Sequence, residues 1–118
     1  MIRIIILAGA LSLGLALPAQ AQRSGTYAVE GTEAGGSRYT GSVQLTATGP
    51  ETWRATWRIG GEVTNGVGIG GNEVLALGYT AQRETGTAIF ITQPDGTLDG
   101  RWTSGTAGSV GTERWLPR

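Results

Sequence analysis

The sequence predicts an all-β protein, an antiparallel up-and-down meander of about eight short strands that closes into a small barrel. Three observations favour this fold. From residue 26 onwards apolar residues recur with a period of two, which is typical of half-buried strands. Glycine accounts for 21 of 118 residues, many of them between the periodic segments. Glycine inside a helix costs about 1 kcal/mol relative to alanine, and no segment beyond the N-terminus has helical spacing of apolar residues.

The alternation is clearest in two segments. In 38–47 and 52–59, apolar or small residues alternate with arginine, threonine, serine and glutamine. The breaks between segments consist of residues that accept a positive φ or favour a turn, as in Gln93-Pro-Asp-Gly96. Together these signals predict strands at about 26–31, 38–47, 52–59, 62–69, 73–80, 86–92, 97–103 and 110–116.

Barrel closure follows from the short connections. Strands joined by short turns are antiparallel neighbours, and an open meander would leave two unpaired edges. Closing eight strands removes the edges and leaves an interior just wide enough for side chains or one small ligand. Because the strands are short, we expect a packed interior rather than a deep cavity. A two-sheet sandwich is the competing architecture.

The first 21 residues have the pattern of a signal peptide. Arg3 precedes an apolar run from Ile4 to Leu17, and Ala19-Gln-Ala21 forms a small-x-small cleavage site. The run is shorter than the roughly 20 residues of a membrane span. We therefore expect cleavage after Ala21, a single domain over 22–118 without a membrane span, and a periplasmic or secreted location. An uncleaved anchor is the alternative.

Composition argues against most chemistries. The chain has no lysine, histidine or cysteine. The absence of cysteine excludes a lipid anchor and disulfides, and the absence of histidine removes the usual proton shuttle. The usual nitrogen and sulfur ligands for metals are also missing. Nine arginines balance nine carboxylates, which leaves no basic surplus for nucleic acid. Most of the carboxylates are expected at turns or on outward faces, so a glycosidase pair is not predicted. We expect no enzyme activity, no catalytic residue, no metal and no cofactor.

The sequence Gly66-Val-Gly-Ile-Gly-Gly71 matches the glycine pattern of dinucleotide sites. A dinucleotide site needs a helix to open at these glycines, and here another strand follows. A glycine-rich strand or bend is the better interpretation.

Two groups of residues are candidates for binding. Trp53, Trp57 and Trp102 would line a pocket for a small apolar or sugar ligand, or else fill the core as aromatic side chains commonly do. Arg54 and Arg58 share the opposite strand face, where they would bind an anion or form a solvated outer surface.

Several strand and turn motifs follow one another in a specific order. They are Gly25-Thr-Tyr27-x-Val29-x-Gly31, Tyr39-x-Gly41-x-Val43, Trp57-x-Ile59-Gly60, Gly66-Val-Gly68-Ile69, Leu75-Ala-Leu77-Gly78-Tyr79, Asp95-Gly96-x-Leu98-x-Gly100-x-Trp102-Thr103 and Gly111-Thr112-Glu113. This order resembles that of a family of small exported bacterial proteins, mostly uncharacterised and sometimes labelled "fibronectin-binding protein". The resemblance implies an exported protein and supplies no catalytic residues.

These observations leave three main hypotheses for function, ahead of a fourth, a hydrolase that uses paired carboxylates. The leading one is a non-enzymatic barrel that binds an unknown protein or envelope component through its loops, rim or outer face. The second is a small-molecule carrier with a Trp-lined interior. The third is an inhibitor of an envelope enzyme, acting through a projecting loop such as 31–37 or 104–109.

Overall fold

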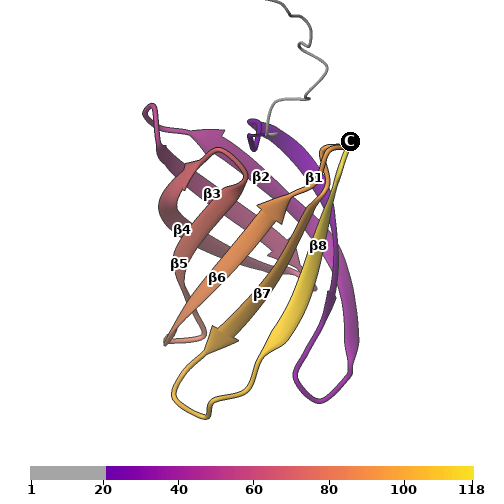
Figure 1. Ribbon diagram of the computed structural model, residues 1–118. Coiled ribbons are helices and arrows are strands. Elements are labelled where there is room, and N and C mark those ends of the chain that lie inside the picture. The colour runs from indigo at the N-terminus through magenta and orange to yellow at the C-terminus, as the bar shows by residue number, and fades with distance from the viewer. Residues whose placement is uncertain (1–20) are drawn as a thin grey trace, which may run out of the picture.

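A computed structural model describes residues 21–118, so the predicted signal peptide lies outside the described residues apart from Ala21. The described chain forms one closed barrel in which each strand pairs with its neighbour in sequence (Figure 1). The strands are β1 (Gly25–Thr32), β2 (Arg38–Ala47), β3 (Thr52–Ile59), β4 (Glu62–Gly71), β5 (Val74–Ala81), β6 (Glu84–Thr92), β7 (Leu98–Ser104) and β8 (Gly111–Pro117).

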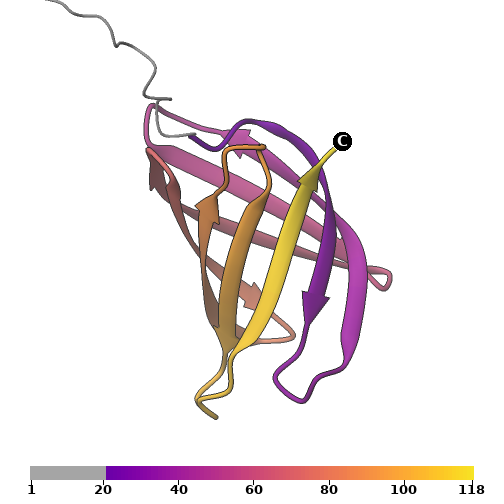
Figure 2. The same ribbon diagram turned by 45° about the vertical axis from the view of Figure 1, so that its right-hand side comes forward.

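The predicted meander is confirmed, and the sandwich is not formed. Figure 2 shows β8 lying between β7 and β1, where the barrel closes. Six residue pairs join β1 to β8 in antiparallel register, from Tyr27 opposite Pro117 to Thr32 opposite Thr112. The Asn65-Gly66 pair, a common turn signal, lies inside β4, opposite Thr80 and Tyr79 of β5.

The barrel has two different ends. The chain termini of the barrel and the connections 48–51, 72–73 and 93–97 lie at one end, here called the closed end (Figure 1). The connections 33–37, 60–61, 82–83 and 105–110 lie at the other, here called the open end. Among residues 21–118 no helix is long and apolar enough to cross a membrane.

Glycines make room for aromatic rings inside the barrel. Four large aromatic side chains lie directly across a strand pair from a glycine, and a Cβ at that glycine would collide with the ring. The pairs are Tyr39 with Gly31, Tyr79 with Gly86, Phe90 with Gly100, and Trp102 with Gly111. The high glycine content therefore serves packing as well as turns.

Side chains fill the middle of the barrel. The fully buried Trp115 ring packs against Phe90, Tyr27 and Trp57, with ring centroids 4.3, 5.8 and 5.9 Å away. The interior is therefore packed at its middle, as expected from the short strands.

The closed end is covered by the residues that precede β1. Gln22 is only 4% exposed. With its amide oriented to satisfy both groups, it donates to the Asn72 carbonyl and accepts from the Gly71 N–H, each at 3.2 Å. Trp53 lies at this end too, donating from its indole nitrogen to the Gly70 carbonyl at 3.2 Å.

Candidate functional site

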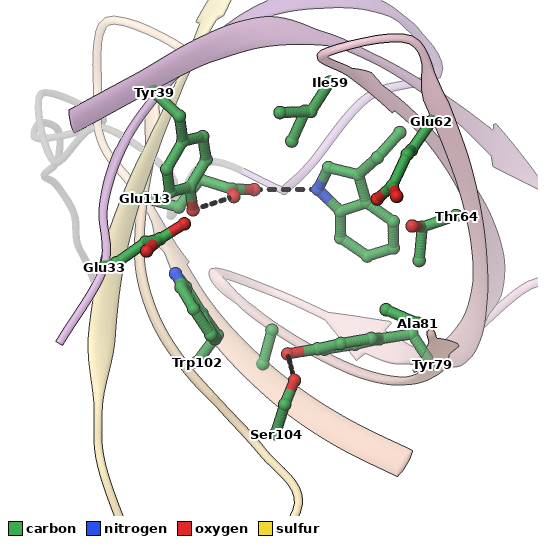
Figure 3. Close-up of a pocket in the computed structure, with 12 residues that line it drawn as sticks. Glu33, Tyr39, Ile59, Glu62, Thr64, Tyr79, Ala81, Trp102, Ser104 and Glu113 are labelled. Atoms are coloured by element: carbon green, nitrogen blue, oxygen red, sulfur yellow. Dashed lines mark hydrogen bonds between the residues drawn. The ribbon is translucent and has the colours of Figure 1, made fainter. Parts of the chain in front are cut away.

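A cavity of about 210 Å³ occupies the interior at the open end. The expectation of a packed interior is therefore wrong for this half of the barrel. Seven strands and the β1–β2 connection contribute to the wall, and Figure 3 shows the labelled side chains arranged around the space. The lining residues are Glu33, Tyr39, Trp57, Ile59, Glu62, Thr64, Tyr79, Ala81, Ala88, Trp102, Ser104 and Glu113.

Glu113 is the buried polar centre of the cavity wall. Its side chain is 7% exposed and accepts three hydrogen bonds. The Tyr39 hydroxyl donates to Oε1 at 2.6 Å and the Trp57 indole nitrogen donates to Oε2 at 2.7 Å, as the dashed lines in Figure 3 show. The Trp115 indole nitrogen also donates to Oε2, at 2.6 Å. Because a donor meets each oxygen, the side chain acts only as an acceptor in this arrangement.

Glu113 is not among the binding residues predicted from the sequence. The signal was present, because the period of two in β8 places Gly111, Glu113 and Trp115 on one face, and all three are buried. The residues opposite Glu113 on the two neighbouring strands are Gly31 and Gly100, which leave space for the rings around it. A carboxylate in phase with a buried tryptophan is thus a detectable pattern.

Two aromatic pairs form much of the cavity wall. Trp57 and Tyr79 have ring centroids 5.6 Å apart, and Tyr39 and Trp102 meet edge to face at 6.4 Å. The Tyr79 hydroxyl donates to the Thr103 carbonyl at 2.9 Å and lies 2.9 Å from the Ser104 hydroxyl. These contacts hold the Tyr79 ring in place in the cavity wall.

The hydroxyls of both cavity tyrosines are held in the protonated form. Burial raises the pKa of Tyr39 far above its usual value, and the neighbouring Glu113 carboxylate raises it further. Burial also raises the pKa of Tyr79, although its hydrogen bond with Ser104 partly offsets the rise. At neutral pH both groups are therefore neutral hydrogen-bonding groups.

Trp102 carries a buried polar atom without a partner. Its indole nitrogen makes no hydrogen bond of good geometry within the described part of the chain, although it lies near enough to the Tyr39 hydroxyl to lower the pKa of that group slightly. In Figure 3 this nitrogen points towards the side of the cavity where Tyr39 and Glu33 lie. A buried N–H that lacks an acceptor is costly, so an acceptor from a ligand would be stabilised here.

The structure separates the three predicted tryptophans. Trp57 and Trp102 both line the cavity, whereas Trp53 fills the core at the closed end. Trp57 is also core, since it is 6% exposed. Of the two interpretations, core filling applies to Trp53 and pocket lining applies to Trp102. Both apply to Trp57.

Arg54 and Arg58 lie on the outer face of β3. Both are exposed, and each is placed opposite residues of β2 and β4 that also face outwards. No salt bridge within 21–118 involves either residue, and the one ion pair found there joins Arg114 to Asp99 at 2.8 Å. Anion binding by Arg54 and Arg58 stays a prediction.

A second surface feature lies outside the barrel. On the outer face of β4, β5 and β6, Ile69, Ala76 and Ile89 stand in one row of the register. Large apolar side chains here are exposed, with Val67 and Ile69 at 66% and Ile89 at 51%. Monomeric proteins seldom expose contiguous apolar surface of this kind unless it binds something.

The fold resembles designed proteins. No family model and no curated protein matches the chain. Among solved structures, a redesigned β-barrel is 16% identical with a TM-score of 0.67, covering 80% of this chain and 90% of its own. A de novo designed fluorescence-activating β-barrel is 14% identical with a TM-score of 0.62, covering 81% and 94%. At such low identity these similarities establish the barrel fold alone.

Proposed function

We propose that this protein is an exported, non-enzymatic barrel that binds a small molecule in the cavity at the open end. The observation that carries the proposal is the cavity of about 210 Å³, walled by aromatic rings around a buried, hydrogen-bonded carboxylate. Small-molecule sites are usually preformed, concave and mostly apolar, with a few polar groups that orient the ligand. Of the three hypotheses from the sequence, the carrier is the one this geometry favours.

The size of the cavity limits the ligand. A cavity of about 150 Å³ accommodates benzene, so the space here suits a compact molecule rather than a lipid or an oligosaccharide. The unpartnered Trp102 N–H offers a hydrogen bond to an oxygen on that molecule. The N-terminal signal pattern motivates the exported location.

Thermal unfolding with a panel of compact ligands tests the proposal. A ligand present at 100 times its dissociation constant adds about 2.7 kcal/mol, which in a domain of this size raises the melting temperature by about 10 °C or more. Binding should also change the fluorescence of the tryptophans, because Trp57 and Trp102 line the site.

A matched pair of variants locates the bound ligand. Thr64 faces into the cavity from β4, and Thr80 lies exposed on the outer face of the neighbouring β5. Thr64→Phe should abolish the melting shift, whereas Thr80→Phe should leave it intact. Equal shifts in both variants would place the ligand elsewhere and contradict the proposal.

A second candidate function is protein binding through the apolar outer face of β4–β6. It rests on the exposure of Val67, Ile69 and Ile89. An Ile69→Thr, Ile89→Thr double variant should keep the melting temperature, since both residues are exposed, but lose a partner that the parent protein retains from envelope extracts. Equal retention by both proteins would contradict this function.

A further inference from the structure

The charges that line the cavity have one sign. Glu33, Glu62 and Glu113 are among its twelve lining residues, and no arginine is. Glu33 and Glu62 are exposed at the rim, whereas Glu113 is buried in the wall. The negative potential is therefore concentrated where a ligand would enter, because low-dielectric walls focus the field of such groups.

Glu113 has hydrogen bonds but no counter-charge. Its three donors are neutral phenol and indole groups, and no salt bridge within residues 21–118 includes it. Buried charges in proteins are usually paired. A positively charged group in the cavity would supply the missing partner.

The aromatic rings of the cavity wall, like its carboxylates, favour a positively charged ligand. The Trp57–Tyr79 and Tyr39–Trp102 pairs contribute four rings to one small cavity. The faces of such rings carry negative electrostatic potential and attract ammonium groups, most strongly where the cation is shielded from water. Carboxylates and rings together would also repel an anion.

On the basis of the proposed cavity function, we infer that the ligand is a compact organic cation. It carries an alkylammonium group and, a few bonds away, an oxygen that accepts hydrogen bonds. The ammonium group takes the place between the rings near Glu113, and the oxygen accepts the hydrogen bond that the Trp102 N–H otherwise lacks. The cavity volume fits such a molecule, and its chemistry satisfies both the unpaired charge and the unpaired donor.

Three molecules of nearly identical shape test the charge. Choline is the cation, 3,3-dimethylbutan-1-ol is its neutral isostere, and 3,3-dimethylbutanoate is an anion of similar size. Titration of the purified protein by calorimetry at neutral pH and low salt should show choline binding about tenfold or more tighter than the neutral isostere. The anion should bind more weakly than either.

Charge variants with a matched control identify the source of the preference. Glu33→Gln with Glu62→Gln removes the two rim carboxylates, and Glu51→Gln with Glu73→Gln removes two exposed carboxylates at the closed end. Net charge changes equally in both. The rim pair should lower choline affinity by about three- to tenfold and leave the neutral isostere unaffected, whereas the closed-end pair should change neither.

Two single substitutions test the interior groups. Glu113→Gln should reduce the preference for choline over the neutral isostere, with folding checked by near-UV circular dichroism. Trp102→Phe keeps an aromatic ring, although a smaller one, and removes the N–H, so it should weaken choline and the neutral alcohol alike. A Glu113→Gln protein that folds and keeps the full preference would overturn the inference.

Failure of the inference differs from failure of the proposed function. If the neutral isostere or the anion binds as tightly as choline, and Thr64→Phe abolishes that binding, the cation is overturned while the cavity function stands. If choline does not bind but neutral compounds from the melting panel do, the cation is likewise overturned and the cavity function stands. If no ligand of any charge binds in the cavity, both are overturned.

Discussion

At the residue scale, the identity of Glu113 decides how the interior is organised. Its two oxygens accept from Tyr39, Trp57 and Trp115, which come from three different strands. Without it, the two indole nitrogens would be buried polar atoms without a partner, and the part-buried Tyr39 hydroxyl would lose its acceptor. One carboxylate thus lets three large aromatic residues share a narrow interior.

Replacing Glu113 should distinguish its hydrogen bonds from its charge. A glutamine can accept both indole bonds through its oxygen and donate to the Tyr39 hydroxyl, which can reverse its role. Glu113→Gln should therefore cost no more than about 1–2 kcal/mol, whereas Glu113→Leu leaves three donors unpartnered and should cost about 3 kcal/mol or more. Urea unfolding of both variants measures the difference, and equal costs would contradict this account.

Trp57 belongs both to the packed core and to the cavity wall. Its side chain is 6% exposed, packs against Trp115 and Tyr79, and donates to Glu113. Trp57→Ala should lower the free energy of unfolding by about 3–5 kcal/mol. Urea unfolding monitored by far-UV circular dichroism checks this loss, and a near-neutral result would show that the ring contributes little to the core.

At the element scale, glycine and aromatic residues on adjacent strands are complementary. The inward positions of β4 include Gly66, Gly68 and Gly70, and the neighbouring β3 presents Trp53 and Trp57. A Cβ at Gly66 would lie 2.9 Å from the Trp57 ring. Gly66 therefore leaves the space that the Trp57 ring occupies, and the segment is a glycine-rich strand, as predicted.

Two glycines of the same strand should respond oppositely to substitution. At Gly68 a Cβ would collide with the Ala76 carbonyl oxygen, which is backbone and cannot move freely, whereas at Gly71 it would meet nothing within 4 Å. Gly68→Ala should cost about 1–3 kcal/mol or more, and Gly71→Ala should be neutral or stabilising by up to about 1 kcal/mol. Thermal unfolding of the two proteins compares them directly, and equal melting temperatures would argue against the packing role of β4.

At the scale of the whole molecule, titration above neutral pH is unusually simple. The chain has no lysine, histidine or cysteine, so its three tyrosines are the side chains that titrate in mildly alkaline solution. Burial raises the pKa of Tyr27, Tyr39 and Tyr79. Above the unfolded tyrosine pKa of about 10, the unfolded chain therefore binds fewer protons than the folded one.

Stability should consequently depend on pH in one direction. It should be nearly constant from about pH 8 to 9.5 and fall progressively above about pH 10, as tyrosines ionise more readily in the unfolded chain. Urea unfolding at a series of pH values measures this slope. Tyr39→Phe should reduce it, because Tyr39 has the most strongly raised pKa of the three. A slope that the substitution leaves unchanged would contradict the assignment.

Most of the fold could be predicted because the signals were local. Alternation in segments such as 38–47 and 52–59 depends on the burial of one strand face, and those strand bounds agree with the structure. The Asn65-Gly66 pair, although a common turn dipeptide, lies inside β4 and within the strand predicted at 62–69. There Gly66 is needed for the close approach of the Trp57 ring, and the sequence of β4 alone does not contain that information.

The amino-acid sequence by itself determined the period-two strands, the order of the meander and the absence of the usual catalytic groups, because these depend on neighbouring residues and composition. Only the tertiary structure decided that Glu113 meets Tyr39 and Trp57, and that Trp53 lies at the closed end while Trp102 lines the cavity. Glu113 lies 74 residues from Tyr39 and 56 residues from Trp57 in the sequence. Strand register and barrel closure bring these side chains together. A site made by closing a barrel is non-local, and so its geometry becomes visible only when all eight strands are paired.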